Sequence, residues 1–420
     1  MPDIPFPLRD AHLHLIAHGA ELSAVQLADC TSVDACLQRI ASAAADTPAG
    51  SWIRAVGARP EAWAERRSPS ADELEDAAAG RPCFVLCFDH HALSAGRSAL
   101  ALADMADAGP SGFIPTGADG RPTGLLLEGA CKQLLRAVPK PTERDSLNHL
   151  RTAQADLQSR GFVEVHEMMA EPLHVRLLQK LEEQGDLELT VMLYATPDHF
   201  DDVRRMCAEL TSIRIHFAGL KLFTDGTLNS RTAHMLTPYA DPIPDAPLGT
   251  PLLSADDIHR HMLRAHDEQF DVAAHAIGDG AVRTLIDAYA SIDDPTFQLR
   301  IEHAQFIDEA DIERFPRHRI VASVQPSHLL TDMEAIERLM PHRASRAFPL
   351  QDLVQATGAD VDSLVLFGSD TPIVDPSPFD NLQAATERRR QGMDASTAIA
   401  PEQAIDASLA WRLMRSTVGS

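Results

Sequence analysis

The sequence lacks the features that would point to a membrane protein, a secreted protein or a nucleic-acid-binding protein. No uncharged apolar stretch reaches the roughly 20 residues that cross a bilayer. The first residues, Met-Pro-Asp-Ile-Pro-Phe-Pro, have no basic region followed by a long apolar one, so they do not resemble a signal peptide. Basic residues are also scarce, with 37 Lys and Arg against 61 Asp and Glu and a net charge of -24. An acidic chain of this kind argues against nucleic acids and anionic membrane surfaces as partners.

Closely spaced cysteine pairs are absent as well. The six cysteines are scattered, and none forms a C-x-x-C pair. Cys83 and Cys87 lie in an apolar run, where buried free thiols are expected. No disulfide framework is indicated, which fits a reducing compartment. The sequence therefore predicts a cytoplasmic protein.

What the chain does contain is a series of short apolar runs separated by helical stretches. Its 420 residues are 45% hydrophobic, as in an ordinary globular protein. Eight runs are typical of buried strands, and each has room for a helix after it; they cover residues 8–15, 162–168, 187–194, 215–223, 272–276, 299–304, 320–325 and 364–367. Buried strands with helical crossovers form parallel sheets. Eight such repeats predict an α/β fold with a (β/α)8 TIM barrel.

The spacing of these runs predicts one long insertion. Residues 1–15 hold the first barrel strand, 16–160 an inserted α/β subdomain, and 161–420 the remainder of a single catalytic barrel domain. Within the insertion, Gly117-Ala118-Asp119-Gly120 is typical of a turn between two extended arms, which predicts a β-hairpin near 114–127.

The first strand carries His12 and His14 at positions i and i+2. Alternate side chains of a strand share a face, so the two imidazoles are expected to project together. Neutral imidazole is the commonest metal ligand, and two on one strand would supply half of a site. Taken alone, the pair is equally compatible with polar residues that bind backbone or water. The rest of the chain has to decide between these interpretations.

Other ionisable residues stand where later strands end, which is where barrel enzymes carry their chemistry. They are Lys221, His275, His303 and Asp370, and the second strand adds His166. Each has an ordinary alternative: a lysine can extend toward solvent from a strand end, and an aspartate can cap the next helix. Glu302, beside His303, is expected on the opposite face as a structural pairing partner. Together, however, so many ionisable groups would be costly to bury without a ligand, which favours metal binding.

The order of these residues and the sequence motifs around them resemble those of the metal-dependent amidohydrolase superfamily. The resemblance is strongest to its amidohydrolase 3 branch, which includes the N-substituted formamide deformylases. The match runs along nearly the whole chain. It rests on D-A-H-L-H-L at 10–15, D-G-R-P-T-G-L-L-L-E-G-A at 119–130, G-L-K-L-F-T-D-G-T-L-N-S-R-T-A at 219–233, H-A-I-G-D-G-A at 275–281, I-E-H-A-Q at 301–305 and G-S-D-T-P at 368–372.

The resemblance implies a centre of two divalent metal ions, most simply zinc. His12 and His14 would hold one ion together with Asp370, and His275 and His303 would hold the other. Lys221 would bridge both as a carboxylated lysine, because an N-carboxylate is an anion whereas an ammonium repels cations. A hydroxide shared by two ions would attack the substrate, and Asp370 would act as the catalytic proton acceptor and donor.

For the residues around this centre, the sequence indicates candidates but does not assign each of them a single role. His91, His166, Arg231 and His328 are candidates for contact with a substrate carbonyl or carboxylate. For Arg231 the alternative is a hydrogen bond that locks its own loop, and for His166 a place in the core. Three aspartates are candidates for orienting the imidazoles from behind, namely Asp10, Asp225 and Asp279.

The sequence departs from the superfamily pattern at its ends. Many members carry a small β-sandwich beside the barrel, made from both ends of the chain, but only about seven residues precede the first strand here. We therefore expect this sandwich to be absent or vestigial. The uncovered barrel flank could serve as the interface of a homodimer.

The resemblance favours one function and leaves others open. The first is hydrolysis of a carbon–nitrogen bond in a small, amide-like, non-peptide substrate. Lactone hydrolysis or deamination on the same barrel is an alternative, although deaminases usually have a glutamate shortly after the fifth-strand histidine and no bridging lysine, whereas this chain has His275-Ala276-Ile277-Gly278-Asp279 and Lys221. A third possibility is a non-catalytic regulator that binds metal and a small ligand.

Overall fold

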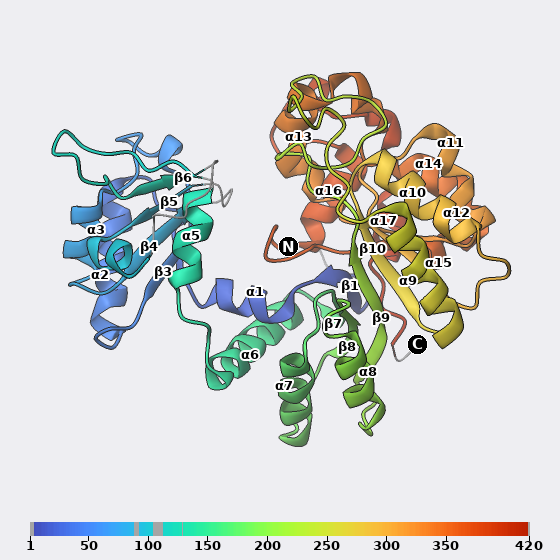
Figure 1. Ribbon diagram of the computed structural model, residues 1–420, viewed down its shortest axis with the longest axis horizontal. Helices are drawn as coiled ribbons and strands as arrows, with labels where there is room; N and C mark the ends of the chain where they lie inside the picture. Colours follow the sequence, from blue (N-terminus) through green and yellow to red (C-terminus); the bar gives the residue numbers. More distant parts are fainter. Residues whose placement is uncertain (1–3, 88–91, 104–111, 128, 419–420) are drawn as a thin grey trace. The chain divides into compact units, whose positions relative to one another are not determined.

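The computed structural model describes residues 4–87, 92–103, 112–127 and 129–418, and these form two compact units. One unit comprises Met1–His18 and Ala153–Ser420, and the other comprises Gly19–Thr152. The second is thus inserted into the first between strand β1 and strand β7 of the chain (Figure 1). Helices α1 (Leu15–Leu22) and α6 (Glu143–Ser159) come directly after β1 and directly before β7.

The larger unit is built on a sheet of eight parallel strands. All eight predicted strands are present, and neighbours in the sheet follow chain order; they are β1 (Leu8–Leu13), β7 (Phe162–Glu167), β8 (Thr190–Ala195), β9 (Ile215–Phe223), β10 (Asp271–Ala276), β11 (Leu299–His303), β12 (Val321–Val324) and β13 (Val365–Phe367). Because parallel strands need crossovers, helices lie between them along the chain. The predicted TIM barrel is confirmed.

The barrel closes where its first and last strands meet, and we call this junction the seam. It is held by Asp370 N donating to His12 O at 2.6 Å and by His14 N donating to Thr371 O at 2.9 Å. Leu13 and Thr371 form an isolated parallel bridge at the same place. The seam therefore lies in the segments that carry three of the predicted metal ligands.

The crossover helices pack their apolar faces on the outside of the barrel. They include α7 (Pro172–Glu183), α8 (Phe200–Ala208), α9 (Ala255–Glu268), α10 (Asp279–Ala290), α13 (His328–Leu339) and α16 (Pro378–Glu387). In α9 the buried residues are Ile258, Met262 and Ala265, at the i, i+4, i+7 spacing of one helix face. Figure 1 shows α9 and α10 side by side along the strands that they connect.

The end of the chain packs against its beginning. Helix α17 (Ala407–Leu413) leads into a segment in which Arg415 forms an antiparallel bridge with Leu8 and Ser416 N donates to Pro7 O at 3.0 Å. The named strands of the described ranges belong to the barrel and to one further sheet in the inserted unit. A flanking β-sandwich is thus absent from this part of the chain, as predicted.

The inserted unit is a five-stranded mixed sheet between two helical layers. Its strands are β2 (Val25–Gln26), β3 (Ile53–Ala58), β4 (Cys83–Cys87), β5 (Ala92–Ala95) and β6 (Leu125–Leu127). Alternation along β4 sends Cys83 and Val85 to a core with α2 (Val33–Asp46) and α3 (Ala71–Ala77). Phe84 and Leu86 enter a second core with α4 (Arg97–Leu102) and α5 (Gly129–Ala137).

The predicted hairpin near 114–127 has one strand instead of two. Its second arm is β6, whereas the first arm meets the second only through the isolated bridges Phe113–Leu127 and Thr116–Pro122. Gly117 N donates to Arg121 O at 2.8 Å across the predicted turn. Pro115 and Pro122 have no N–H to donate, which interrupts a regular ladder.

Among the helices of the described ranges, none combines the length needed to cross a bilayer with sufficient apolar character.

Candidate metal centre

The six predicted metal ligands come from the carboxyl ends of five barrel strands. His12 and His14 stand at the end of β1, Lys221 lies in β9, His275 lies in β10, His303 ends β11, and Asp370 follows β13. The parallel arrangement places these ends at one mouth of the barrel. His12, His303 and Asp370 each offer a ligand atom, and these three atoms lie within 4.8 Å of one another.

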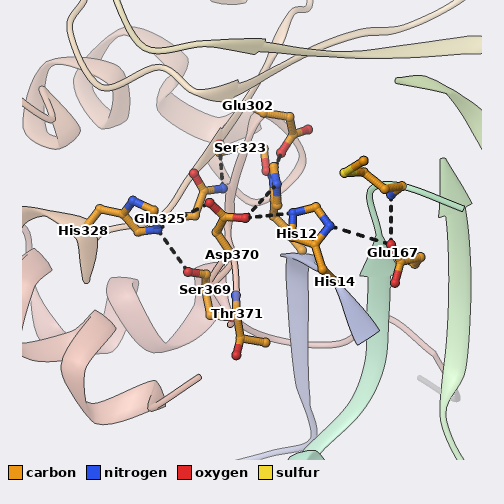
Figure 2. Close-up of polar contacts among 12 residues, drawn as sticks. His12, His14, Glu167, Glu302, Ser323, Gln325, His328, Ser369, Asp370 and Thr371 are labelled. Carbon is orange, nitrogen blue, oxygen red and sulfur yellow. Dashed lines mark hydrogen bonds and ion pairs between the residues drawn. The ribbon is translucent and has the colours of Figure 1, made fainter. Parts of the chain in front are cut away.

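The Asp370 carboxylate joins the two histidines of the first strand. Its Oδ1 lies 3.4 Å from His12 Nε2 and 3.1 Å from His14 Nε2, and Figure 2 shows both imidazoles facing it. Burial alone would raise the pKa of Asp370, but the adjacent His12 and His14 hold it below its usual value. The aspartate is therefore an anion next to two imidazole nitrogens, which is a suitable donor set for a divalent cation.

The imidazoles of His275 and His303 extend this cluster. Their ring centroids are 4.5 Å apart, and the rings of His303 and His12 are 4.9 Å apart. Burial and the neighbouring histidines lower the pKa of His303 well below its ordinary value, so the ring is neutral and able to bind metal. His275 Nε2 lies 3.1 Å from Gly226 O. A hydrogen bond donated from Nε2 leaves the lone pair of His275 Nδ1 free to bind an ion.

Two of these ligands have an unusual backbone conformation. His303 has φ 70° and Asp370 has φ 63°, in the left-handed region that residues with a side chain rarely adopt. Each such residue costs on the order of 1–2 kcal/mol and persists only where its surroundings require it. At both positions the strand ends and the side chain turns into the mouth of the barrel.

Lys221 differs from the other predicted ligands because its amine forms no hydrogen bond with the described residues, although its Nζ lies 5.0 Å from the centre of the Phe223 ring. Its side chain is 1% exposed, and its Nζ has no hydrogen-bond partner in the described part of the chain. Burial lowers the pKa of Lys221 to about 8, although Glu302 and Asp370 act in the opposite direction. A buried amine without a partner is destabilising, which indicates that a group outside the described protein atoms completes its environment.

The Glu302 side chain does not lie on the face opposite to His303, where the sequence predicted it. Strict alternation would place its side chain opposite that of His303, but His303 has a left-handed φ, and the side chains of both residues contact His12. His12 Nδ1 donates to Glu302 Oε2 at 2.6 Å, and Arg300 binds the same carboxylate. Sequence reasoning missed Arg300. The signal was available, because R-I-E places two opposite charges on one face of a buried strand.

The three aspartates proposed to orient imidazoles mostly bind backbone amides instead. Asp10 Oδ1 accepts from His12 N at 3.1 Å and from Ser369 N at 2.9 Å, which ties the two sides of the seam together. Asp225 accepts from the backbone after β10 and also lies 3.3 Å from His275 Nε2. Asp279 binds Leu236 N and the Arg343 side chain. Of the three, only Asp225 approaches a ligand imidazole in this structure.

The four candidate substrate contacts have different positions. His328 stands at the mouth, with Nε2 3.7 Å from Asp370 Oδ2 (Figure 2). His166 is buried away from the three clustered ligands, between Glu164 and Arg300. Arg231 donates to Asp241 Oδ2 at 2.8 Å and locks its own loop, as its alternative interpretation predicted. His91 lies outside the described residues.

Comparisons with known proteins agree with this architecture. The Amidohydro_3 model of the amidohydrolase family matches residues 7–417. The chain is 27% identical to the putative amidohydrolase YtcJ of Bacillus subtilis, over 90% of this chain and 72% of that protein. It is 25% identical to the N-substituted formamide deformylase of Arthrobacter pascens, over 96% of this chain and 76% of that protein.

A solved structure is similar over nearly the same extent. It is an uncharacterised metal-dependent hydrolase from Pyrococcus horikoshii, with a TM-score of 0.77 and 26% identity over 96% of this chain and 78% of the other. Barrel, clustered ligands and family match lead to one conclusion. The chain belongs to the amidohydrolase family and is a metal-dependent hydrolase.

Proposed function

We propose that the protein hydrolyses a carbon–nitrogen bond in a small, non-peptide amide at a centre of two zinc ions. The observation that carries this proposal is the buried Lys221 amine, which has no hydrogen-bond partner among the described residues and interacts electrostatically with Asp370, His12 and His303. Carboxylation of this amine would turn an unpartnered group into an anionic ligand. Its lowered pKa increases the fraction of uncharged amine, which is the form that can react with carbon dioxide.

The ligands divide into two groups by position. His12, His14 and Asp370 would hold one ion at the seam, and His275 and His303 would hold the other, with carboxylated Lys221 between them. When bound, the ions would lower the pKa of water and polarise the substrate carbonyl. The neutral state of His12, whose pKa burial and Lys221 lower to about 4, leaves a lone pair available for this purpose.

Asp370 is the residue suited to proton transfer. It is an anion at the mouth of the barrel, and its Oδ2 faces His328 while its Oδ1 faces His12 and His14. We assign it the role of accepting a proton from the attacking water and returning that proton to the departing nitrogen. The second transfer matters because an amine anion is a poor leaving group.

The substrate class is proposed from the relatives and from the mouth of the barrel. One relative is an N-substituted formamide deformylase. His328, at the start of α13, is close enough to Asp370 to contact a group bound beside it. Its Nε2 lies 3.2 Å from Ser369 O, so the proton on Nε2 is directed at the backbone, and Nδ1 remains for a substrate N–H.

Metal analysis and a substrate panel test the proposal. We expect about two zinc ions per chain and turnover of N-formyl, N-acyl or cyclic amides, with lactones and exocyclic amines as comparison substrates. A protein that binds no transition metal would falsify the proposal. Turnover of lactones or amines alone, with none of the amides, would reassign the reaction.

The state of Lys221 has its own measurement. Intact-protein mass of the metal-loaded form should exceed that of the acid-treated form by one carbon dioxide in addition to the ions. A Lys221→Met variant should lose this added mass together with most of its bound metal. An unmodified lysine in fully metal-loaded protein would remove the bridge from the proposal.

A further inference from the structure

The barrel interior contains a row of buried polar side chains on β7 and β11. They are Glu164, His166, Arg300 and Glu302, and all four are buried. Barrel interiors are usually filled by packed branched apolar side chains. Four ionisable groups in this position are costly unless each is fully paired. We call this row the axial column.

At one end of the axial column, Glu302 contacts His12, one of the predicted metal ligands. His12 Nδ1 lies 2.6 Å from Glu302 Oε2, so the proton of the imidazole is on Nδ1 and is donated to the carboxylate. His12 Nε2 is then free of a proton, and it is the nitrogen that lies 3.4 Å from Asp370 Oδ1. Glu302 therefore determines which nitrogen His12 offers to an ion.

Arg300 holds Glu302 in place. Its guanidinium binds both carboxylate oxygens, with Nε at Oε1 and Nη2 at 3.2 Å from Oε2. Such a two-point contact fixes both the position and the rotation of the carboxylate plane.

The remaining donors of Arg300 are bound on the other sides. Nη2 shares its two hydrogens among Glu302 Oε2, Ala11 O and Ser323 Oγ, the last at 3.0 Å, and Nη1 donates to His166 Nδ1 at 2.6 Å. Ser323, Ala11 and His166 come from β12, β1 and β7, so the guanidinium is held by three strands besides its own. A lysine has one nitrogen at this position and cannot make the same set of contacts.

At the other end of the axial column, His166 binds Arg300 and Glu164 binds His166. Because His166 Nδ1 accepts from Arg300, its proton is on Nε2, which donates to Glu164 Oε1 at 3.1 Å. Glu164 Oε2 in turn accepts from Ser416 Oγ at 2.7 Å. The two histidines therefore carry their protons on opposite nitrogens, and each choice follows from the same arginine.

We propose that Arg300 is a positioning residue for the metal centre: it fixes Glu302, and through Glu302 it keeps the His12 proton on Nδ1 and directs Nε2 toward the ion. This inference rests on the proposed metal-dependent function. It extends that function to a residue that contacts neither an expected ligand atom nor a substrate.

Metal affinity in two variants and one control tests the proposal. Loss of a partner that orients a ligand typically weakens metal binding 10–100-fold. We expect Arg300→Lys and Glu302→Gln to raise the Kd for zinc by about this factor, measured by competition with a chromophoric chelator. The control is Arg388→Lys, at a fully buried arginine that donates to the backbone oxygens of Ala347, Phe348 and Ile399.

The control separates positioning from general stability. Arg388→Lys should lower the free energy of unfolding without changing zinc affinity, whereas Arg300→Lys should change both. If folded Arg300→Lys binds zinc as tightly as the unmodified protein, the inference is wrong while the proposed function stands. If the unmodified protein binds no metal, the proposed function fails first.

A spectroscopic measurement on the unmodified protein covers the case in which Arg300→Lys does not fold. Nitrogen-15 spectra of the histidine side chains distinguish the two neutral forms of imidazole. We expect the His12 signal, assigned by its loss in His12→Asn, to show a proton on Nδ1 and the His166 signal to show one on Nε2. A proton on Nε2 of His12 in the metal-free protein would overturn the proposal.

Discussion

Asp370 combines more roles than any other residue of the site. It ends a barrel strand in a left-handed conformation, its N–H closes the seam, and its carboxylate faces three imidazoles. A residue held from so many directions has little freedom to change its orientation. Such preorganisation is what proton transfer at a fixed distance requires.

The substitution Asp370→Asn should separate proton transfer from folding. The amide has the same shape but cannot accept the proton, so we expect kcat to fall by about 10²–10⁴-fold. The metal-to-protein ratio, measured in the same sample, shows whether ligand loss contributes. Asp375→Asn is the matched control, because this exposed carboxylate follows Asp370 in the loop before α16 and pairs with Arg160. Unchanged kcat in Asp370→Asn would mean that another group transfers the proton.

His166 makes a pH dependence measurable. Burial lowers its pKa to about 4, although Glu164 acts in the opposite direction. Between about pH 6.5 and 4 the unfolded chain therefore binds a proton that the folded chain does not, so the free energy of unfolding falls as the pH is lowered. The full contribution of this one group is about 3 kcal/mol.

The variant His166→Gln should remove that contribution, because the amide oxygen can accept from Arg300 but does not titrate. Urea unfolding between pH 7 and 5 measures the slope in both proteins. His216→Gln, at a half-buried histidine whose Nε2 contacts Ile213 O, is the control. Equal slopes in His166→Gln and the unmodified protein would contradict the assignment.

At the level of residues, the sequence predicted side chains with distinctive chemistry better than their partners. The six proposed ligands stand at strand ends, which their positions along the chain were sufficient to predict. The neighbours Glu302 and His303 both contact His12, and the left-handed φ of His303 is not predicted by any local pattern. His166 was placed correctly on its strand, but its distance from the clustered ligands depends on how deep in the barrel it lies.

Among the elements, the junction of β13 with β1 leaves no room for a side chain at Gly368. A Cβ on Gly368 would lie 2.5 Å from His12 N and 2.8 Å from His12 Cβ, both shorter than real contacts. Only glycine lets the last strand approach the first this closely. The position of His12 is therefore set partly by a residue on the opposite side of the seam.

We predict that Gly368→Ala displaces His12. Overpacking of this kind costs about 1–3 kcal/mol of stability, and zinc affinity should fall with it. Thermal unfolding and zinc titration measure the two effects. Gly185→Ala is the control: its φ is +75°, and nothing lies near an added Cβ, so only backbone strain of about 1 kcal/mol is expected. Wild-type zinc affinity in Gly368→Ala would show that the junction can relax.

The elements themselves were predictable to different degrees. The eight barrel strands are continuous apolar runs because both faces are buried, and such runs are visible in a sequence. The arm at Phe113 and Thr116 is extended but forms only isolated bridges, because prolines interrupt its ladder. Extended character is a local property, whereas pairing depends on donors from both arms.

For the barrel as a whole, the proposed metal ligands lie on both sides of the seam. His12 and His14 belong to the first strand, and Asp370 belongs to the segment after the last. An ion bound by all three would connect the two sides. Binding to the folded state alone adds about 4 kcal/mol of stability at a free metal concentration 1,000 times the Kd.

Removal of metal should therefore loosen the seam selectively. After chelation we expect faster hydrogen exchange at the amides of His14 and Asp370, while amides between β7 and β8 keep their protection. Hydrogen exchange read by mass spectrometry, with and without added zinc, measures this. Uniform loss of protection around the barrel would indicate that the ion stabilises the whole barrel and not the seam.

The seam also has a consequence for the order of events during synthesis. His12 and His14 leave the ribosome with the first segment, but Asp370 follows only after the inserted unit and seven further strands have been made. Pairings between distant segments form slowly, so barrel closure is expected among the last steps of folding. The complete ligand set comes into existence only at that step. Zinc uptake by refolding protein would then report the moment of closure, with a rate independent of zinc concentration.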